Sequence, residues 1–193
     1  MEGKMHRFDS IKRLIRDLDK EVVVVGNLGP TSDEMWHAED REKNYYTYGS
    51  MGLCSSIALG ISLNCKNKVI AFEGDGSMLM NLGSLATIGR ENPSNLIVLI
   101  WDNEMWGQVG RQHSHTHYKA NLEEISKGSG ISQTATVDNI EQLEIVFNKA
   151  LSSEGPWVIV AKIEEEEYLP VAPVEPEKTT YRFREAMLKN TNA

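Results

Sequence analysis

Two short polar segments follow apolar runs, and their residue types are the best suited to chemistry in this sequence. Gly74-Asp75-Gly76-Ser77 comes after the apolar run at residues 69–72, and Asn103 comes after the run at residues 96–100. Apolar runs of this length are typical of buried parallel strands. Both segments are then expected at the carboxyl ends of adjacent strands, where open α/β sheets hold their ligands.

The residue types in these segments favour a divalent cation and a phosphate. Gly74 and Gly76 allow backbone N–H groups to approach an anion. A helix expected over residues 78–90, starting near Ser77, adds the positive end of its dipole. Asp75 and Asn103 supply oxygen ligands, which a backbone carbonyl and phosphate oxygens would complete to an octahedral magnesium site. An ordinary strand-to-helix turn is the alternative.

The Gly74-Asp75-Gly76-Ser77 segment followed by Asn103 resembles the cofactor motif of thiamine-diphosphate-dependent enzymes. The resemblance implies that Asp75 and Asn103 bind magnesium through their side chains and Met105 through its carbonyl. It also implies a three-layer, doubly wound α/β fold, with a mostly parallel sheet and helices on both faces.

A second segment, Gly49-Ser50-Met51-Gly52, is similar to a cofactor-binding segment of thiamine-diphosphate decarboxylases. The resemblance implies that the Gly49 carbonyl meets the 4′-amino group and that Met51 wedges between the two cofactor rings, with Ser50 in the same binding segment. Such a wedge brings the amino nitrogen close to the thiazolium C2, a shape that the relaxed cofactor does not hold. A plain core role for Met51 is the alternative.

Two further loops hold candidates for contact with the diphosphate. Asn27 and Ser32 follow a β-branched run at residues 22–25. Their loop either touches the diphosphate or caps a helix expected after Asp33. The backbone N–H near Gln108, in the segment after Asn103, is another candidate donor.

Histidines occupy alternate positions at His113, His115 and His117. Along a strand they would share one face. The equivalent loop of the resembled decarboxylases lies at the mouth of the active site, where a cationic loop would suit a dianionic substrate. We therefore treat His113 and His115 as candidate substrate contacts, with an exposed loop or a metal site as alternatives.

Composition limits the class of protein. The chain of 193 residues suits one α/β domain over residues 1–193, with an acidic, proline-rich tail from about residue 164. The formal charge of −8 argues against nucleic acid or an anionic membrane as a partner. Neither a signal peptide nor a membrane-spanning run is evident, and two cysteines suggest no disulfide frame, so a reducing cytoplasm is expected.

The resemblance also implies a missing part. Catalysis in the family needs a glutamate against the aminopyrimidine ring, carried by a separate pyrimidine-binding domain. Residues 22–163 match only the diphosphate-binding domain. No catalytic residue is therefore assigned with certainty in this chain, which is expected to be a subunit, inactive or nearly so alone. An α partner subunit would supply the glutamate, and self-association is also expected.

Size and domain content resemble the β subunits of sulfopyruvate decarboxylases, and phosphonopyruvate decarboxylases are similar in this half. The resemblance implies decarboxylation of a 3-substituted pyruvate, such as sulfopyruvate to sulfoacetaldehyde, with thiamine diphosphate and Mg²⁺ as cofactors. The alternatives are another reaction of the superfamily, such as acetohydroxyacid synthesis or half of a transketolase, and a non-catalytic cofactor-binding module.

Apolar spacing predicts the remaining elements. Helices are expected over residues 8–18, 53–63, 122–128, 140–151 and 179–190, and strands over residues 22–25, 133–137 and 157–163. Asn121 is a possible N-cap of the helix at residues 122–128. Residues 41–48 show no clear period, and the acidic run at residues 164–167 is expected to face solvent.

Overall fold

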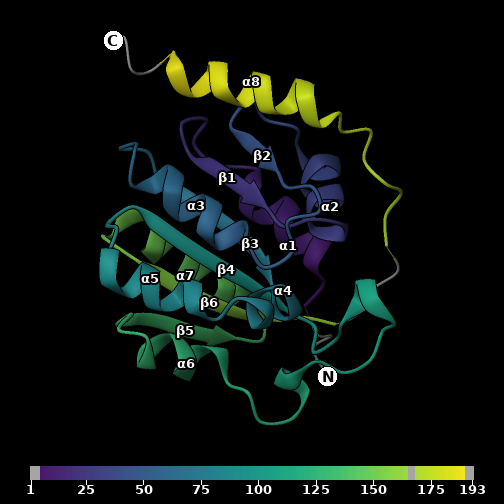
Figure 1. Ribbon diagram of the computed structural model, residues 1–193, viewed down its shortest axis with the longest axis vertical. Helices are drawn as coiled ribbons and strands as arrows, with labels where there is room; N and C mark the ends of the chain where they lie inside the picture. Colours follow the sequence, from purple (N-terminus) through teal and green to yellow (C-terminus); the bar gives the residue numbers. More distant parts are fainter. Residues whose placement is uncertain (1–4, 165–167, 190–193) are drawn as a thin grey trace.

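The computed structural model describes residues 5–164 and 168–189. Their strands form one six-stranded parallel sheet in the order β2-β1-β3-β4-β6-β5 (Figure 1). The strands are β1 (Val23–Gly26), β2 (Asn44–Tyr46), β3 (Val69–Gly74), β4 (Leu96–Asp102), β5 (Gln133–Val137) and β6 (Trp157–Lys162). The expected parallel α/β sheet is confirmed, while the assignment of residues 1–193 to a single domain stays a prediction.

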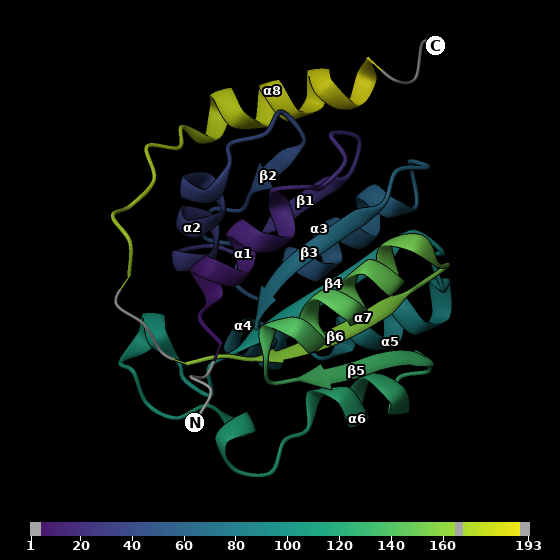
Figure 2. The same ribbon diagram turned by 180° about the vertical axis from the view of Figure 1, so that it is seen from behind.

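Helices cover both faces of the sheet, as the two opposite views show (Figures 1 and 2). One face carries α1 (Arg7–Ile15), α2 (Pro30–Ala38) and α7 (Ile140–Ser152). The other carries α3 (Cys54–Ser62), α4 (Asp75–Met80), α5 (Gly83–Glu91), α6 (Leu122–Gly128) and α8 (Pro176–Leu188). The expected three-layer architecture is therefore confirmed.

Side chains that alternate along the strands contribute to two hydrophobic cores, one on each face of the sheet. In β3, Ile70 and Phe72 belong to the core under α1, α2 and α7. Val69 and Ala71, between them, belong to the core on the opposite face. All four side chains are fully buried, which explains why the central strands are continuously apolar.

One expected helix is divided in the structure, and one strand was not predicted. The helix expected over residues 78–90 is divided into α4 and α5, and the chain leaves helical geometry at Asn81 (φ −143°). At this position the Asn81 side-chain amide donates to the Gly52 carbonyl at 2.8 Å. The strand β2, at the sheet edge, was not predicted because its three polar and aromatic residues show no alternation.

The C-terminal segment packs against its own chain. Phe183 of α8 is buried and meets the ring of Tyr45 at 5.2 Å between centroids. The Arg182 guanidinium pairs with the Asp40 carboxylate. The helix expected at residues 179–190 starts earlier, at Pro176, and ends at Leu188. Residues 165–167 of the acidic run, and residues 190–193, lie outside the described part of the chain.

The remaining helices and strands match their predicted positions to within a few residues. Asn121 is confirmed as an N-cap, because its side-chain oxygen accepts from the Glu124 N–H at 3.0 Å. Within the described ranges, none of the helices has the length and apolar character needed to cross a membrane.

Candidate functional site

A cleft lies at the carboxyl ends of β1, β3 and β4 and gathers most of the predicted cofactor-binding residues. The predicted residues that line it are Asn27, Met51, Gly74, Asp75, Gly76, Ser77, Asn103, Met105 and Gln108. They come from loops that are far apart in the sequence but share one edge of the sheet. This is the edge at which parallel α/β sheets hold ligands.

The register of β3 against β4 brings the two proposed side-chain ligands of a metal together. Gly74 pairs with Trp101 in adjacent strands. Asp75 and Asn103 follow these paired positions by one and two residues. Both side chains line the same cleft, as their placement in the sequence predicts.

Asp75 is the first residue of α4 and is 2% exposed. Its Oδ2 accepts from the Ser114 hydroxyl at 2.5 Å and from the Thr116 hydroxyl at 3.2 Å. Burial and the nearby Asp102 carboxylate raise the pKa of Asp75 to about 6, although these hydrogen bonds act in the opposite direction. A cation at the cleft would relieve this electrostatic cost by favouring the ionised carboxylate.

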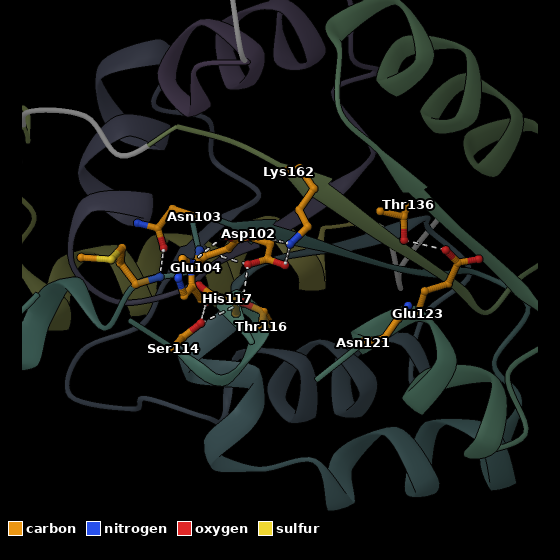
Figure 3. Close-up of polar contacts among 12 residues, drawn as sticks. Asp102, Asn103, Glu104, Ser114, Thr116, His117, Asn121, Glu123, Thr136 and Lys162 are labelled. Atoms are coloured by element: carbon orange, nitrogen blue, oxygen red, sulfur yellow. Dashed lines mark hydrogen bonds and ion pairs between the residues drawn. The ribbon is translucent and has the colours of Figure 1, made fainter. Parts of the chain in front are cut away.

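Asp102 ends β4 and belongs to a polar network with Thr116 and Lys162 (Figure 3). Its Oδ1 accepts from Thr116 at 2.7 Å and its Oδ2 from Lys162 Nζ at 2.8 Å. Lys162 also donates to Glu104 Oε1 at 2.7 Å. Burial lowers the pKa of Lys162, but the two carboxylates outweigh it and leave that pKa above its ordinary value. Lys162 thus compensates the charge of Asp102.

Asn103 and Met105 present oxygen atoms on one side of the segment that follows β4. Met105 lies opposite His113 in an antiparallel bridge. The flanking bonds run from Ser114 N–H to Glu104 O and from Trp106 N–H to Gln112 O, both at 2.8 Å. Met105 is therefore the non-hydrogen-bonded position, and its own N–H and C=O face away from His113. That N–H donates to Asn103 Oδ1 at 3.1 Å, so the Met105 carbonyl faces the side of the Asn103 amide.

The donor set fits a magnesium-bound diphosphate. Asp75 offers a carboxylate, Asn103 an amide oxygen and Met105 a carbonyl, which leaves the remaining octahedral positions to phosphate and water oxygens. The described residues contain no cluster of three His, Cys, Asp or Glu side chains that could hold a metal alone. Trp101 also lines the cleft, and its indole Nε1 has no hydrogen-bond partner among the described residues.

Ser77 joins three segments behind the cleft. Its hydroxyl accepts from the Gly52 N–H at 2.8 Å and donates to Asn27 Oδ1 at 3.3 Å. The loop after β1, the segment before α3 and the first turn of α4 are thereby held together. Asn27 and Ser77 therefore position the backbone of the cleft as well as lining it.

The Gly49-Ser50-Met51 segment lies only partly in the cleft. Met51 lines it, whereas Gly49 lines an adjoining hollow together with Ser32. Gly49 has a φ of 61°, a conformation that favours glycine. The Ser50 hydroxyl donates to the Tyr48 carbonyl at 3.1 Å. The proposed cofactor contacts of these residues stay predictions.

Ser32 stabilises the loop that precedes α2. Its hydroxyl donates to the Asn27 carbonyl at 2.7 Å, inside the protein. The helix begins at Pro30, so it was wrong to expect its start after Asp33. A cofactor contact by Ser32 remains a prediction.

The histidine loop differs from the strand that its alternation suggested. Residues His115–His117 form a 3-10 turn, so the three histidines do not share one strand face. His113 stacks on His117 with ring centroids 3.6 Å apart, and His115 meets Trp106 edge to face. The arrangement gives no metal-holding cluster in the described part of the chain. Substrate contact by His113 and His115 stays a prediction.

Sequence reasoning missed the polar side chains that support the cleft. Glu73 is fully buried, accepts from the Ser55 N–H at 3.1 Å, and has a pKa raised by burial. Ser114 and Thr116 alternate with the histidines and point inward. The sequence signal that could have identified Ser114 and Thr116 is their alternation with the histidines beside the predicted site.

Comparison with known proteins identifies the family. Residues 25–161 match the family model described as thiamine pyrophosphate enzyme, C-terminal TPP binding domain. A solved structure from Mycobacterium smegmatis, assigned as a thiamin diphosphate-dependent enzyme, has the same fold, with a TM-score of 0.70 and 22% identity over 84% of this chain and 32% of that one.

Curated relatives narrow the family further. The chain is 45% identical to sulfopyruvate decarboxylase subunit beta from Methanocaldococcus jannaschii, over 95% of this chain and 98% of the relative. It is 43% identical to the same subunit from Methanococcus maripaludis, over 96% of this chain and 100% of the relative. The chain therefore belongs to the thiamine pyrophosphate enzymes, as a C-terminal cofactor-binding domain in the branch that contains the sulfopyruvate decarboxylase β subunits.

Proposed function

We propose that this chain is the cofactor-binding β subunit of a two-component 2-oxoacid decarboxylase that converts sulfopyruvate to sulfoacetaldehyde and CO₂. The observation that carries the proposal is the near-full-length similarity to two β subunits with that name. The proposed cofactors are thiamine diphosphate and Mg²⁺, and the proposed location is the reducing cytoplasm, in keeping with the free thiols Cys54 and Cys65.

A partner α subunit is part of this proposal. The chain is 39% identical to a sulfopyruvate decarboxylase from Methanosarcina acetivorans but spans only 47% of that relative. The undivided relative thus has a second portion of similar length, which supports a separate partner here. We propose that this partner carries the pyrimidine-binding domain and its activating glutamate, and that the heteromeric pairs also self-associate.

The residues of this chain would bind and orient the cofactor. Asp75, Asn103 and the Met105 carbonyl would hold Mg²⁺ against the diphosphate. When bound, thiamine diphosphate supplies the electron sink for loss of CO₂. Met51 would fix the relative orientation of the two cofactor rings, and the packed cleft wall formed by Trp106 would exclude water from the diphosphate.

Reconstitution tests the proposal. The purified chain should show little decarboxylation of sulfopyruvate alone and should gain it when the α subunit is added, in a reaction that requires thiamine diphosphate and Mg²⁺. Sulfoacetaldehyde and CO₂ are the products to measure. A reconstituted complex that binds the cofactor but turns over none of sulfopyruvate, phosphonopyruvate and pyruvate would favour a non-catalytic module instead.

Phosphonopyruvate is the second candidate substrate. The chain is 31% identical to phosphonopyruvate decarboxylase from Streptomyces hygroscopicus, over 93% of this chain and 45% of the relative. Competition between sulfopyruvate and phosphonopyruvate in the reconstituted complex separates the two, because the preferred substrate has the higher kcat/KM. Acetolactate formation from pyruvate would instead indicate an acetohydroxyacid synthase.

A further inference from the structure

We propose that Thr116 and Ser114 are positioning residues for the metal ion, holding the Asp75 carboxylate in the orientation that Mg²⁺ requires. The inference rests on the proposed function, because Asp75 is the expected carboxylate ligand. It assigns a role in positioning a metal ligand to the segment at residues 113–117, through its two hydroxyls and not through its histidines. The inward residues are Ser114 and Thr116, which alternate in the sequence with His113, His115 and His117.

Ser114 and Thr116 are buried, unlike the histidines beside them. Ser114 is 0% exposed and Thr116 is 8% exposed, whereas the histidines on either side of them are exposed. Buried hydroxyl groups almost always form hydrogen bonds with other polar groups. Here both of them meet the same oxygen, Oδ2 of Asp75, and lie 2.8 Å from each other.

Asp102 anchors the Thr116 hydroxyl. Each hydroxyl carries one proton, and the short contacts are Ser114 to Asp75 at 2.5 Å and Thr116 to Asp102 at 2.7 Å. Asp102 is in turn held by Lys162 at 2.8 Å. The two hydroxyls therefore link the Asp75 carboxylate to the ion pair at the ends of β4 and β6. Figure 3 shows the hydroxyls beside that ion pair.

Mg²⁺ restricts the geometry of its ligands more than Ca²⁺ does. Mg²⁺ requires near-ideal octahedral geometry, whereas Ca²⁺ accepts more oxygen ligands at longer and more variable distances. Groups that orient a ligand therefore affect Mg²⁺ affinity more than Ca²⁺ affinity. A carboxylate fixed through Oδ2 cannot rotate freely, so the hydroxyl pair favours the smaller ion.

The test measures metal affinity and does not depend on turnover. In the complex of the full chain with its α subunit and saturating thiamine diphosphate, Mg²⁺ and Ca²⁺ are titrated separately by calorimetry. We expect Thr116→Val to weaken Mg²⁺ binding by about 10- to 100-fold, with a smaller loss for Ca²⁺. Thr116→Ser, which keeps the hydroxyl, should restore Mg²⁺ affinity.

Thr136→Val is the matched control. The Thr136 hydroxyl, on β5, also donates to a carboxylate, that of Glu123 in α6 (Figure 3). This variant should leave both metal affinities unchanged. If Thr116→Val fails to fold, Ser114→Ala carries the same test, because it removes the hydroxyl that donates to Asp75 at 2.5 Å and introduces no larger side chain.

The outcomes separate this inference from the proposed function. Wild-type complex that binds no thiamine diphosphate with Mg²⁺ contradicts both. Wild-type complex that binds normally, with Thr116→Val and Ser114→Ala equally tight for Mg²⁺, overturns the positioning role alone. Equal losses for Mg²⁺ and Ca²⁺ in both variants also overturn it, because they indicate only general structural damage.

Discussion

The indole ring of Trp106 lies directly against Gly76, so that a Cβ atom at Gly76 would stand 2.8 Å from Trp106 Cε3. Only glycine leaves room for the ring at this distance. Gly76 is thus needed in the first turn of α4 for packing and not for a positive φ. The contact also places a large aromatic surface at the wall of the proposed cofactor cleft.

Gly76→Ala should therefore displace Trp106. We expect a loss of about 1–3 kcal/mol in the free energy of unfolding from overpacking, together with weaker binding of thiamine diphosphate. Urea unfolding and calorimetry measure the two effects. Gly60→Ala is the control, since Gly60 lies inside α3 with nothing within 4 Å of its added Cβ. It should stabilise the protein by about 0.5–1 kcal/mol. A Gly76→Ala protein as stable as Gly60→Ala would contradict the packing argument.

Ser77→Ala should loosen the back of the cleft. The substitution leaves the buried Gly52 N–H without its acceptor and removes a donor to Asn27. An unsatisfied buried donor costs about 1–3 kcal/mol, so we expect that loss in urea unfolding, and weaker cofactor binding by calorimetry. Ser126→Ala is the control, because the Ser126 hydroxyl is also buried but bonds only within α6, to the Leu122 carbonyl. Equal cofactor affinity in the two variants would refute the role of Ser77.

Asp75 should make the stability of the metal-free protein depend on pH. Its folded-state pKa of about 6 lies above the ordinary aspartate value of about 3.9. The folded state therefore binds this proton more tightly than the unfolded chain, and the contribution of Asp75 to stability falls as pH rises from about 4 to about 6. The loss is complete about one pH unit above the folded-state pKa.

The comparison with Asp75→Asn isolates this group. The free energy of unfolding of wild type minus that of Asp75→Asn, measured by urea in the presence of a chelator, should decrease as pH rises through this window. A difference that stays constant from about pH 4 to about pH 7 would show that the Asp75 pKa is not raised. Mg²⁺ with thiamine diphosphate should bind more tightly as pH rises through about 6, because the proton competes with the metal.

Met51 should affect turnover more than binding. It lines the cleft without any hydrogen-bonding role, and its proposed contribution is to the shape of the bound cofactor. We expect Met51→Ala to lower kcat of the reconstituted complex by about 100-fold, the cost of misplaced reacting groups, with a much smaller change in cofactor affinity. Met51→Leu, of similar volume, should keep most of the activity. Unchanged kcat in Met51→Ala would indicate a plain packing residue.

The sequence predicts those parts of the site that depend on local pattern. Asp75 and Asn103 each follow a buried apolar strand within a few residues, so the sheet edge that they share follows from parallel pairing alone. The N-cap at Asn121 and the two-sided burial of β3 are also local. These predictions needed no knowledge of contacts between distant residues.

The missed parts depend on contacts between distant residues. Lys162 lies 60 positions from Asp102, and Thr116 reaches Asp75 across 41 positions. No periodicity encodes such pairs. Asn81, at the break between α4 and α5, likewise contacts Gly52 across 29 positions. The hydroxyls that alternate with the histidines contact Asp75 and Asp102, which are also distant in the sequence.

We propose that Asp75, Asn103 and Met105 hold one Mg²⁺ ion against a diphosphate. Anomalous diffraction from crystals of the complex grown with Mn²⁺ and thiamine diphosphate tests it most directly. We predict one metal peak at about 2.0–2.2 Å from the Asp75 carboxylate, the Asn103 amide oxygen and the Met105 carbonyl. A diphosphate-bound metal ion that contacts neither Asp75 nor Asn103 would contradict the account.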